Sequence, residues 1–272
     1  MQGALHLLAA ISLSSLSTMC TIAILVRVTD APLVIAANRD EVYARPTRPP
    51  ERLGDGLAGG VDELSGGTWL ALARAGRFAA VTNQRVMEPP PPGLRSRGLA
   101  VRELAATVDQ DAYATAIDPE RYASMNLVWG DAARVRVGYF RRETNEREIV
   151  TLAPGVHVLC NDKLGSPGFP RGERLAQIIG ELLARKLPLA ELIADLEHAL
   201  ADRHVSAPAD VPPSKFPADF ARELTAICIH GGAYGTRSST VAAFAPGRVL
   251  AYDHADGPPD ETAYRDRLEL LR

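Results

Sequence analysis

Cysteine, aromatic residues and an excess of charge of one sign are all scarce in this chain of 272 residues. The three cysteines, Cys20, Cys160 and Cys228, are odd in number and far apart, so they indicate neither a disulfide framework nor a paired metal site. Such a chain fits a reducing compartment, and we expect a cytoplasmic location. The formal net charge is only -3 and Lys and Arg are scattered, which argues against a nucleic-acid partner. The six histidines form no H-E-x-x-H or C-x-x-C-H motif, so neither a metal site nor covalent haem attachment is expected.

Residues 1–18 precede Met19 and lack the features of a targeting segment. They are apolar, but they have no Lys or Arg near their start and no A-x-A-like cleavage site. They are also too short and too interrupted by serines to span a bilayer, which takes about 20 apolar residues, so no stable membrane insertion is expected.

Three interpretations of this leader stay open. The start codon is misassigned and Met19 is the true start, or a weak export signal is cut before Cys20, or the leader is retained. The first two leave Cys20 as the first residue of the mature chain, whereas the third covers its amine.

Hydrophobic periodicity predicts strands at both ends of the chain and helices between them. β-Branched runs at 21–28 and 33–37 flank a turn and predict a hairpin. Apolar residues recur at helical spacing in 98–107, and Leu and Ile do so in 172–185 and 189–201. Loops are expected at 88–93 and 205–217, and further strands at 68–73, 77–81, 127–129, 135–140, 148–152, 156–160, 225–229, 239–244, 249–252 and 264–271. The pattern is typical of an α+β layered fold, and because no linker or repeat divides it, residues 19–272 are expected to form one domain.

Cys20 follows Met19 directly and opens the first apolar run. If it is the first residue of the mature chain, it carries a thiol nucleophile and an amine that can act as its base. An α-amine has a reference pKa of about 7.7–8.0, so at neutral pH a useful fraction is free to accept the thiol proton. The alternative interpretation is a small buried hydrophobe in a strand, as most free cysteines are.

The segment Asn38-Arg39-Asp40-Glu41 ends the second strand of the predicted hairpin. Because a hairpin brings the far end of its second strand beside the start of its first, this segment should lie near Cys20. Asp40 could hold the α-ammonium in position, and Arg39 could favour the thiolate. The alternative is a polar turn with a surface ion pair.

Three further motifs each admit a functional and a structural interpretation. Asn83 and Asn161 each follow a predicted strand. The functional interpretation of each is an oxyanion donor, and the structural one is an ordinary turn former. Arg237 lies in a glycine-rich connection that starts at Tyr234. The functional interpretation is an anchor for a carboxylate or carbonyl, and the structural one is part of a flexible hairpin loop. The segment Gly66-Gly67-Thr68-Trp69-Leu70 is too short for a phosphate loop and favours close backbone packing around Trp69.

Together these motifs resemble, in order and over essentially all of 19–272, the NRDE proteins, which are the relatives of transport and Golgi organisation protein two. That family resembles, more distantly, the cysteine N-terminal-nucleophile (Ntn) hydrolases such as penicillin V acylase and bile salt hydrolase. The resemblance implies a four-layer αββα sandwich. It implies catalytic roles for Cys20, Arg39, Asp40, Asn83, Asn161 and Arg237. The hydrolases order their motif R-N-x-D, whereas this chain has N-R-D. The candidate substrate-binding residues are Asn38, Trp69 and Tyr234.

The resemblance implies an N-terminal-cysteine amidohydrolase that transfers an acyl group from an amide or thioester to water without a cofactor. An alternative of another class is a non-catalytic carrier of haem, a lipid or acyl-CoA on the same fold. In that case Cys20 or a histidine could ligate the haem iron. The expected partners are therefore a small acyl substrate or haem, and the oligomeric state is left open.

Overall fold

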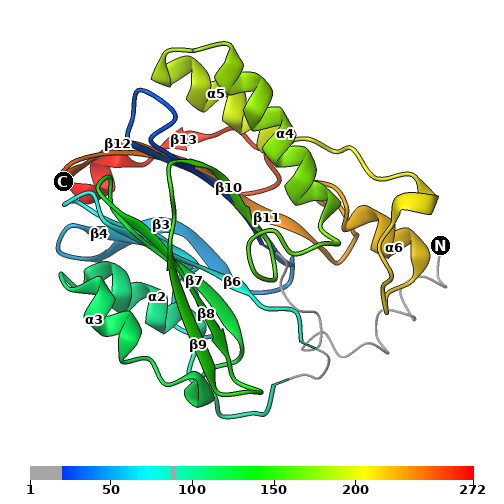
Figure 1. Cartoon of the computed structure of the whole chain (residues 1–272), viewed down its shortest axis with the longest axis horizontal. Helices are drawn as coiled ribbons and strands as arrows, with labels where there is room; N and C mark the ends of the chain where they lie inside the picture. The colour runs from blue at the N-terminus through cyan, green and yellow to red at the C-terminus, as the bar shows by residue number, and fades with distance from the viewer. Residues whose placement is uncertain (1–19, 87–89) are drawn as a thin grey trace.

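The structure is a computed structural model that describes residues 20–86 and 90–272. Two β-sheets stack face to face, and helices cover the outer face of each sheet (Figure 1). The order of layers is helix, sheet, sheet, helix, so the predicted α+β fold and its αββα layering are confirmed. In the described part of the chain, no helix is long and apolar enough to cross a membrane. The predictions for residues 1–18 lie outside the described residues.

The first sheet has six strands in the order β10-β1-β2-β11-β12-β13. β1 and β2 form the predicted hairpin, with Thr21 opposite Asn38. Because β11 pairs with β2 on one side and β12 on the other, chain segments from both ends of the sequence meet in this sheet. The strand bounds are β1 Thr21–Val26, β2 Leu33–Val42, β10 Gly155–Leu159, β11 Tyr234–Ala245, β12 Arg248–Ala255 and β13 Arg265–Asp266.

The second sheet is an antiparallel meander of seven strands in sequence order. Its bounds are β3 Thr47–Gly54, β4 Leu57–Asp62, β5 Leu70–Ala73, β6 Phe78–Asn83, β7 Met125–Gly130, β8 Val135–Arg141 and β9 Glu146–Thr151. β3 and β4 were not predicted from the sequence. β3 contains two prolines, which are tolerated because β3 is an edge strand. β4 contains Gly59 and Gly60, where an added Cβ would lie 2.5 Å from the Leu70 carbonyl oxygen and 2.1 Å from the Trp69 ring.

Helices α4 and α5 pack on the first sheet, and α2 and α3 pack on the second. The buried residues of α2, α4 and α5 fit the helical spacing predicted from the sequence, whereas α3 and α6 were not predicted. The bounds are α2 Arg97–Ala106, α3 Gln110–Thr115, α4 Pro170–Ala184, α5 Leu189–Leu200 and α6 Ala218–Glu223. Short 3₁₀ turns lie at Pro119–Arg121, Pro208–Asp210 and Leu268–Leu271.

Three apolar layers hold the sandwich together. The central layer lies between the sheets and contains Ile24, Leu72 and Phe244, all of them buried. The outer layers lie between the first sheet and α4–α5 and between the second sheet and α2–α3. Alternate residues of each central strand therefore face different layers, which sets the direction of every side chain in the candidate site.

Three expectations about strands were wrong. Residues 225–229 form a turn and bends, and the chain meets β11 there through an isolated bridge between His230 and Gly235. Residues 234–240 are part of β11 and not a loop between strands. The segment 264–271 contains only the two-residue β13 and a 3₁₀ turn.

Candidate functional site

Cys20 immediately precedes β1 at one end of the space between the two sheets. The β1–β2 register, continued by one residue, places Cys20 opposite Arg39, and the β1–β10 register places it opposite Asn161. Its side chain is buried and lines a small cavity together with Arg39 and Trp69. The cavity volume is about 10 Å³, which is room for roughly one water molecule.

The environment of the Cys20 thiol keeps it protonated. Burial raises the pKa of the thiol to about 12, and the negative charge of Asp40 acts in the same direction. The positive charge of Arg39 and a hydrogen bond from the Asp40 backbone N–H oppose both effects. Because the thiolate is not formed in advance at neutral pH, any attack by this sulfur needs a base next to it.

The four residues of the N-R-D-E segment point alternately to opposite faces of β2. Asn38 and Asp40 face the helices, where their side chains contact backbone and side chains outside the sandwich interior. Arg39 and Glu41 face the second sheet, on the same side as Cys20. The segment therefore contributes to two separate polar clusters, one on each face of the sheet.

On the inner face, the Arg39 guanidinium stacks on Trp69 with its carbon 4.3 Å from the ring centroid. Its Nη2 lies 3.5 Å from a carboxylate oxygen of Glu41, and Glu41 also pairs with Arg45 at 3.5 Å. The Nη1 of Arg39 is buried and has no hydrogen-bond partner among residues 20–86 and 90–272. A buried donor of this kind beside the Cys20 sulfur can bind an acceptor atom of a ligand.

On the outer face, Asp40 is fully buried. One carboxylate oxygen accepts a hydrogen bond from Thr236 Oγ1 at 2.7 Å, and the other lies 3.1 Å from Nη1 of Arg171. Burial raises the pKa of Asp40 to about 6, and Arg171 counteracts this shift. The second guanidinium nitrogen of Arg171 donates to Asn161 Oδ1 at 2.9 Å, so one arginine connects the two predicted site residues.

Asn161 and Asn83 meet where the two sheets come together. Asn161 Nδ2 donates to the Asn83 carbonyl at 2.8 Å, and the Arg85 N–H donates to the Asn161 carbonyl at 2.7 Å. The side-chain amide of Asn83 has no hydrogen bond to the rest of the described chain. It stays available for a ligand, whereas the amide of Asn161 is engaged in the protein's own network.

Three other predicted residues are occupied elsewhere. The Asn38 amide nitrogen donates to the carbonyl oxygens of Leu200 and Ile227, both at 2.9 Å, so it ties the helical layer to β2. Tyr234 is buried, and its ring packs edge-on against Phe220. Arg237 sits in a β-bulge between the residues opposite Asp40 and Arg39, and it pairs with Asp256 at 3.1 Å instead of reaching Cys20.

Three residues that help to build the site were not predicted from the sequence. Arg171 lies on the apolar stripe of α4 with Leu175 and Ile179. An arginine at an apolar position of a helix could have been recognised in the sequence as a buried charge that needs a partner. Thr236 lies inside a motif that was quoted only for its arginine. Half-buried Arg97 starts α2; burial lowers its pKa to about 10, and the charges of Cys20 and Glu41 counteract this shift.

A polar seam beside the site joins the two sheets. Thr82 Oγ1 in β6 donates to the Cys160 carbonyl at 2.7 Å, and Asn126 Nδ2 in β7 donates to Thr82 Oγ1 and to the Asp162 carbonyl, both at 3.0 Å. This seam fixes Asn161 relative to Asn83. Among the described residues, the ligand-type side chains that converge closely enough for a metal ion are Cys228, His230 and Asp260, which lie outside this site.

Solved structures with the same fold include hydrolases. The N-acylethanolamine-hydrolyzing acid amidase ortholog of Caenorhabditis elegans matches with a TM-score of 0.50 and 12% identity, covering 82% of this chain and 92% of that one. A variant of the conjugated bile acid hydrolase of Clostridium perfringens matches with a TM-score of 0.53 and 11% identity, covering 93% and 94%. At these identities the likeness establishes the fold, which is that of the Ntn hydrolases.

The family is established by sequence. Residues 19–250 match the family model described as Transport and Golgi organisation 2. A bovine transport and Golgi organization protein 2 homolog is 32% identical over 225 residues, which cover 77% of this chain and 80% of the relative. The human homolog is 28% identical over 228 residues, with the same coverage. The chain belongs to the transport and Golgi organisation 2 family.

Proposed function

We propose that the protein is an N-terminal-cysteine amidohydrolase that transfers an acyl group from an amide or thioester to water. The observation that carries this proposal is the place of Cys20. It immediately precedes a central strand, faces the space between the sheets, and lies beside Arg39 and Asn161. Two neighbours in fold, an acid amidase and a conjugated bile acid hydrolase, are hydrolases by their titles, which supports the same reaction class.

The proposed reaction begins with the thiol proton passing to the free α-amine of Cys20. The sulfur then attacks the acyl carbonyl carbon and forms a tetrahedral oxyanion, which accepts hydrogen bonds from the Asn83 amide and a backbone N–H. The ammonium returns the proton to the leaving nitrogen or sulfur, and the C–N or C–S bond breaks. Water, deprotonated by the same amine, then cleaves the acyl thioester and restores the thiol.

The surrounding residues have positioning roles in this proposal. Asp40, held by Thr236 and Arg171, supplies negative charge near the α-ammonium. Arg39 stabilises developing negative charge on the sulfur or binds a substrate acceptor through its unpartnered Nη1. Because the cavity has room for only about one water molecule, the acyl group must displace the Trp69 and Arg39 side chains to reach the sulfur.

Carriage of haem, a lipid or acyl-CoA stays a prediction, and so do the cytoplasmic location and the role assigned to Arg237. No contact among the described residues favours the carrier over the hydrolase. The two hypotheses separate in one experiment, because a carrier needs no turnover and no free α-amine.

The test uses the chain expressed from Met19, with mass spectrometry to establish that Cys20 is the first residue. N-acyl amides and acyl thioesters are screened against this protein, against Cys20→Ala and against the chain that keeps residues 1–18. We expect turnover only with the first. Asn83→Ala should lower kcat by about 10²–10³-fold, because one oxyanion donor is lost.

Equal turnover by Cys20→Ala would remove the hydrolase proposal. Equal turnover by the chain that keeps residues 1–18 would show that the α-amine is not the base. A parallel titration with haem or a fluorescent acyl-CoA reports on the carrier hypothesis, since binding that survives Cys20→Ala without any turnover would favour it.

A further inference from the structure

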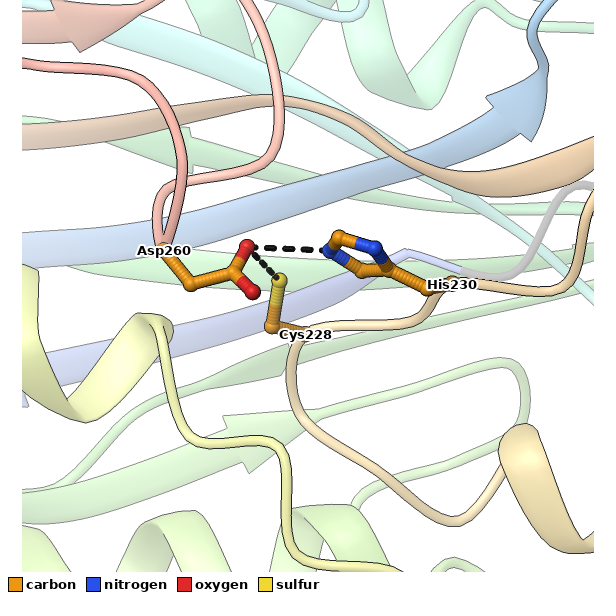
Figure 2. Close-up of side chains that lie close together, drawn as sticks. All are labelled: Cys228, His230 and Asp260. Atoms are coloured by element: carbon orange, nitrogen blue, oxygen red, sulfur yellow. Dashed lines mark hydrogen bonds and ion pairs between the residues drawn. The ribbon is translucent and has the colours of Figure 1, made fainter.

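Cys228, His230 and Asp260 converge on one point outside the Cys20 site (Figure 2). Asp260 Oδ1 lies 3.2 Å from Cys228 Sγ and 3.0 Å from His230 Nε2, and the three ligand atoms all lie within 4.8 Å of one another. Cys228 and His230 come from the segment between α6 and β11. Asp260 comes from the loop between β12 and β13, so the cluster joins two segments that are remote in sequence.

The donor atoms match those of a zinc-type site. A tetrahedral ion with a Zn–S distance of about 2.3 Å and Zn–N and Zn–O distances of about 2.0–2.2 Å keeps its ligand atoms roughly 3.3–3.7 Å apart. The distances of 3.2 and 3.0 Å need to widen by only a few tenths of an ångström to reach that range. A thiol and an imidazole do not suit Ca²⁺ or Mg²⁺, which take oxygen ligands.

The surroundings hold the ligands in this arrangement. The Cys228 N–H donates to the Asp202 carbonyl at 2.9 Å, which fixes the backbone of the cysteine. Glu261 has a carboxylate oxygen 3.7 Å from Nδ1 of His230, so a carboxylate lies behind the imidazole while Nε2 faces the cluster. This distance is too long for a hydrogen bond, but a shift of about 1 Å would let Glu261 accept one from Nδ1–H, as carboxylates behind metal-bound histidines do. Arg203 lies 3.9 Å from the other oxygen of Asp260 and leaves Oδ1 directed at the thiol and imidazole.

Access to the cluster is one-sided. Cys228 is fully buried, whereas the side chains of His230 and Asp260 are 22% and 24% exposed. An ion can therefore enter past the histidine and the carboxylate and reach the sulfur at the inner end. The open side also leaves room for water as a fourth ligand, as in zinc sites with three protein ligands.

We propose that Cys228, His230 and Asp260 bind a divalent transition-metal ion of the zinc class. On binding, the sulfur forms a bond to the metal and releases its proton to solvent, and no group is oxidised or reduced. The ion clamps the β12–β13 loop onto the chain that leads into β11. Ile229, between two of the ligands, donates its N–H to Thr236 Oγ1 at 2.9 Å, and that hydroxyl donates to Asp40, so the clamp adjoins the residues that hold Asp40.

The test uses the full chain after removal of metal with a chelator and titration with Co²⁺, which reports a tetrahedral thiolate site by its absorption. We expect a sulfur-to-cobalt charge-transfer band and visible d–d bands at one equivalent, and their loss when Zn²⁺ displaces Co²⁺. Bound ion should raise Tm by about 5–10 °C at a free ion concentration roughly 100-fold above Kd.

Matched variants separate this site from the N-terminal cysteine, whose thiol and amine can themselves chelate a metal. Cys20→Ala should keep the bands, and Cys228→Ser should lose them. Glu261→Gln should weaken binding by about tenfold, because it removes only the carboxylate behind the histidine. Asp260→Asn, at a partly exposed position, should also lose tight binding while its circular dichroism matches that of the parent chain.

Two results overturn the proposal. One is the absence of a charge-transfer band from the parent chain at micromolar protein and metal. The other is a full band from folded Cys228→Ser or Asp260→Asn. Neither result bears on turnover by Cys20, so this proposal and the hydrolase proposal fail independently.

Discussion

Asp40 and Arg171 form an ion pair whose two side chains are 0% and 1% exposed, the most buried pair in the described part of the chain. Such a pair contributes little net stability, because desolvation offsets the attraction between the charges. Removing one partner is different, since it leaves an uncompensated charge in the interior. The pair also holds Asn161 through the second nitrogen of Arg171, so it organises the site as well as the core.

We expect Arg171→Met to lower the free energy of unfolding by about 3–5 kcal/mol, because it leaves Asp40 buried without its partner. The matched control is Arg174→Met on the same helix, where the pair with Asp202 is partly exposed. That change should cost about 1 kcal/mol or less. Urea denaturation measures both. Similar costs for the two variants would contradict the assignment of Asp40 as an ionised, arginine-dependent group.

His254 gives a second prediction for a single residue. It is 1% exposed in β12, with Nδ1 2.9 Å from Thr240 Oγ1. Burial lowers the pKa of His254 to about 3, and Arg267 and Arg237 act in the same direction. The folded state therefore keeps the ring neutral, whereas the unfolded chain takes up a proton near pH 6.5. The stability from this group is present at pH 7 and is lost as the pH falls below about 6.5.

Between pH 7 and pH 5, the protein should lose about 2 kcal/mol of stability through His254. His254→Gln should show a correspondingly shallower loss of unfolding free energy over the same range. The exposed His204→Gln is the control and should follow the parent chain. Denaturation curves at the two pH values measure these losses. An equal loss of unfolding free energy in the parent and in His254→Gln would show that the ring is already charged in the folded state.

At the scale of elements, the G-G-T-W-L segment is a packing device. Gly67 lies against the start of α2, where a Cβ would meet the Gly98 carbonyl carbon at 2.3 Å. The Thr68 N–H also donates to the Gly98 carbonyl at 3.1 Å. Two glycines therefore let β5 and α2 approach closely, and this contact sets the position of Trp69 beneath Arg39. The close packing expected from the sequence is confirmed.

Gly67→Ala should lower the free energy of unfolding by about 1–3 kcal/mol, because the added methyl group must push backbone apart. Gly180→Ala is the opposite case, since that glycine is exposed in α4 and a Cβ there meets nothing within 4 Å. It should raise stability by about 0.5–1 kcal/mol through helix propensity. Thermal and urea unfolding test the pair, and a neutral Gly67→Ala would contradict the proposed contact.

At the scale of the whole molecule, the sandwich has a polar end and an apolar end. Thr236 lies opposite Asp40 in the polar end, and Phe244 lies opposite Leu33 in the apolar end, eight residues or about 25 Å further along β11. There the rings of Phe244 and Phe78 meet across the two sheets, with centroids 5.5 Å apart. The candidate site and this aromatic contact therefore lie at opposite ends of the same strands.

Changes at the two ends should separate in experiment. Phe244→Leu should cost about 1–2 kcal/mol of stability and leave kcat within about twofold, because it removes core volume far from Cys20. Asn83→Ala should show the reverse, with little change in stability and the loss of kcat described above, since its side-chain amide bonds to nothing else in the described chain. A large drop in kcat for Phe244→Leu would show that the two ends are coupled.

The sequence by itself determined the family motifs, the α+β class and most of the strands and helices. Continuous apolar runs were sufficient for β1 and β2, which are buried on both faces. Helical periodicity was sufficient for α4 and α5, because each buries one regular face. The local pattern failed for β3 and β4, whose prolines and glycines are tolerated only at a sheet edge or under a neighbouring ring. It also failed for 225–229, where a strand-like composition forms a turn and bends.

Only the tertiary structure decided how the polar residues divide into clusters. Alternation along β2 sends Arg39 to the cavity of Cys20 and Asp40 to Arg171 on the opposite face, a division that depends on which sheet face each layer covers. The same holds for Cys228, His230 and Asp260, which are brought together by the pairing of β11 with β12. Sequence spacing does not predict these side-chain clusters, because they arise from long-range packing of strands and loops.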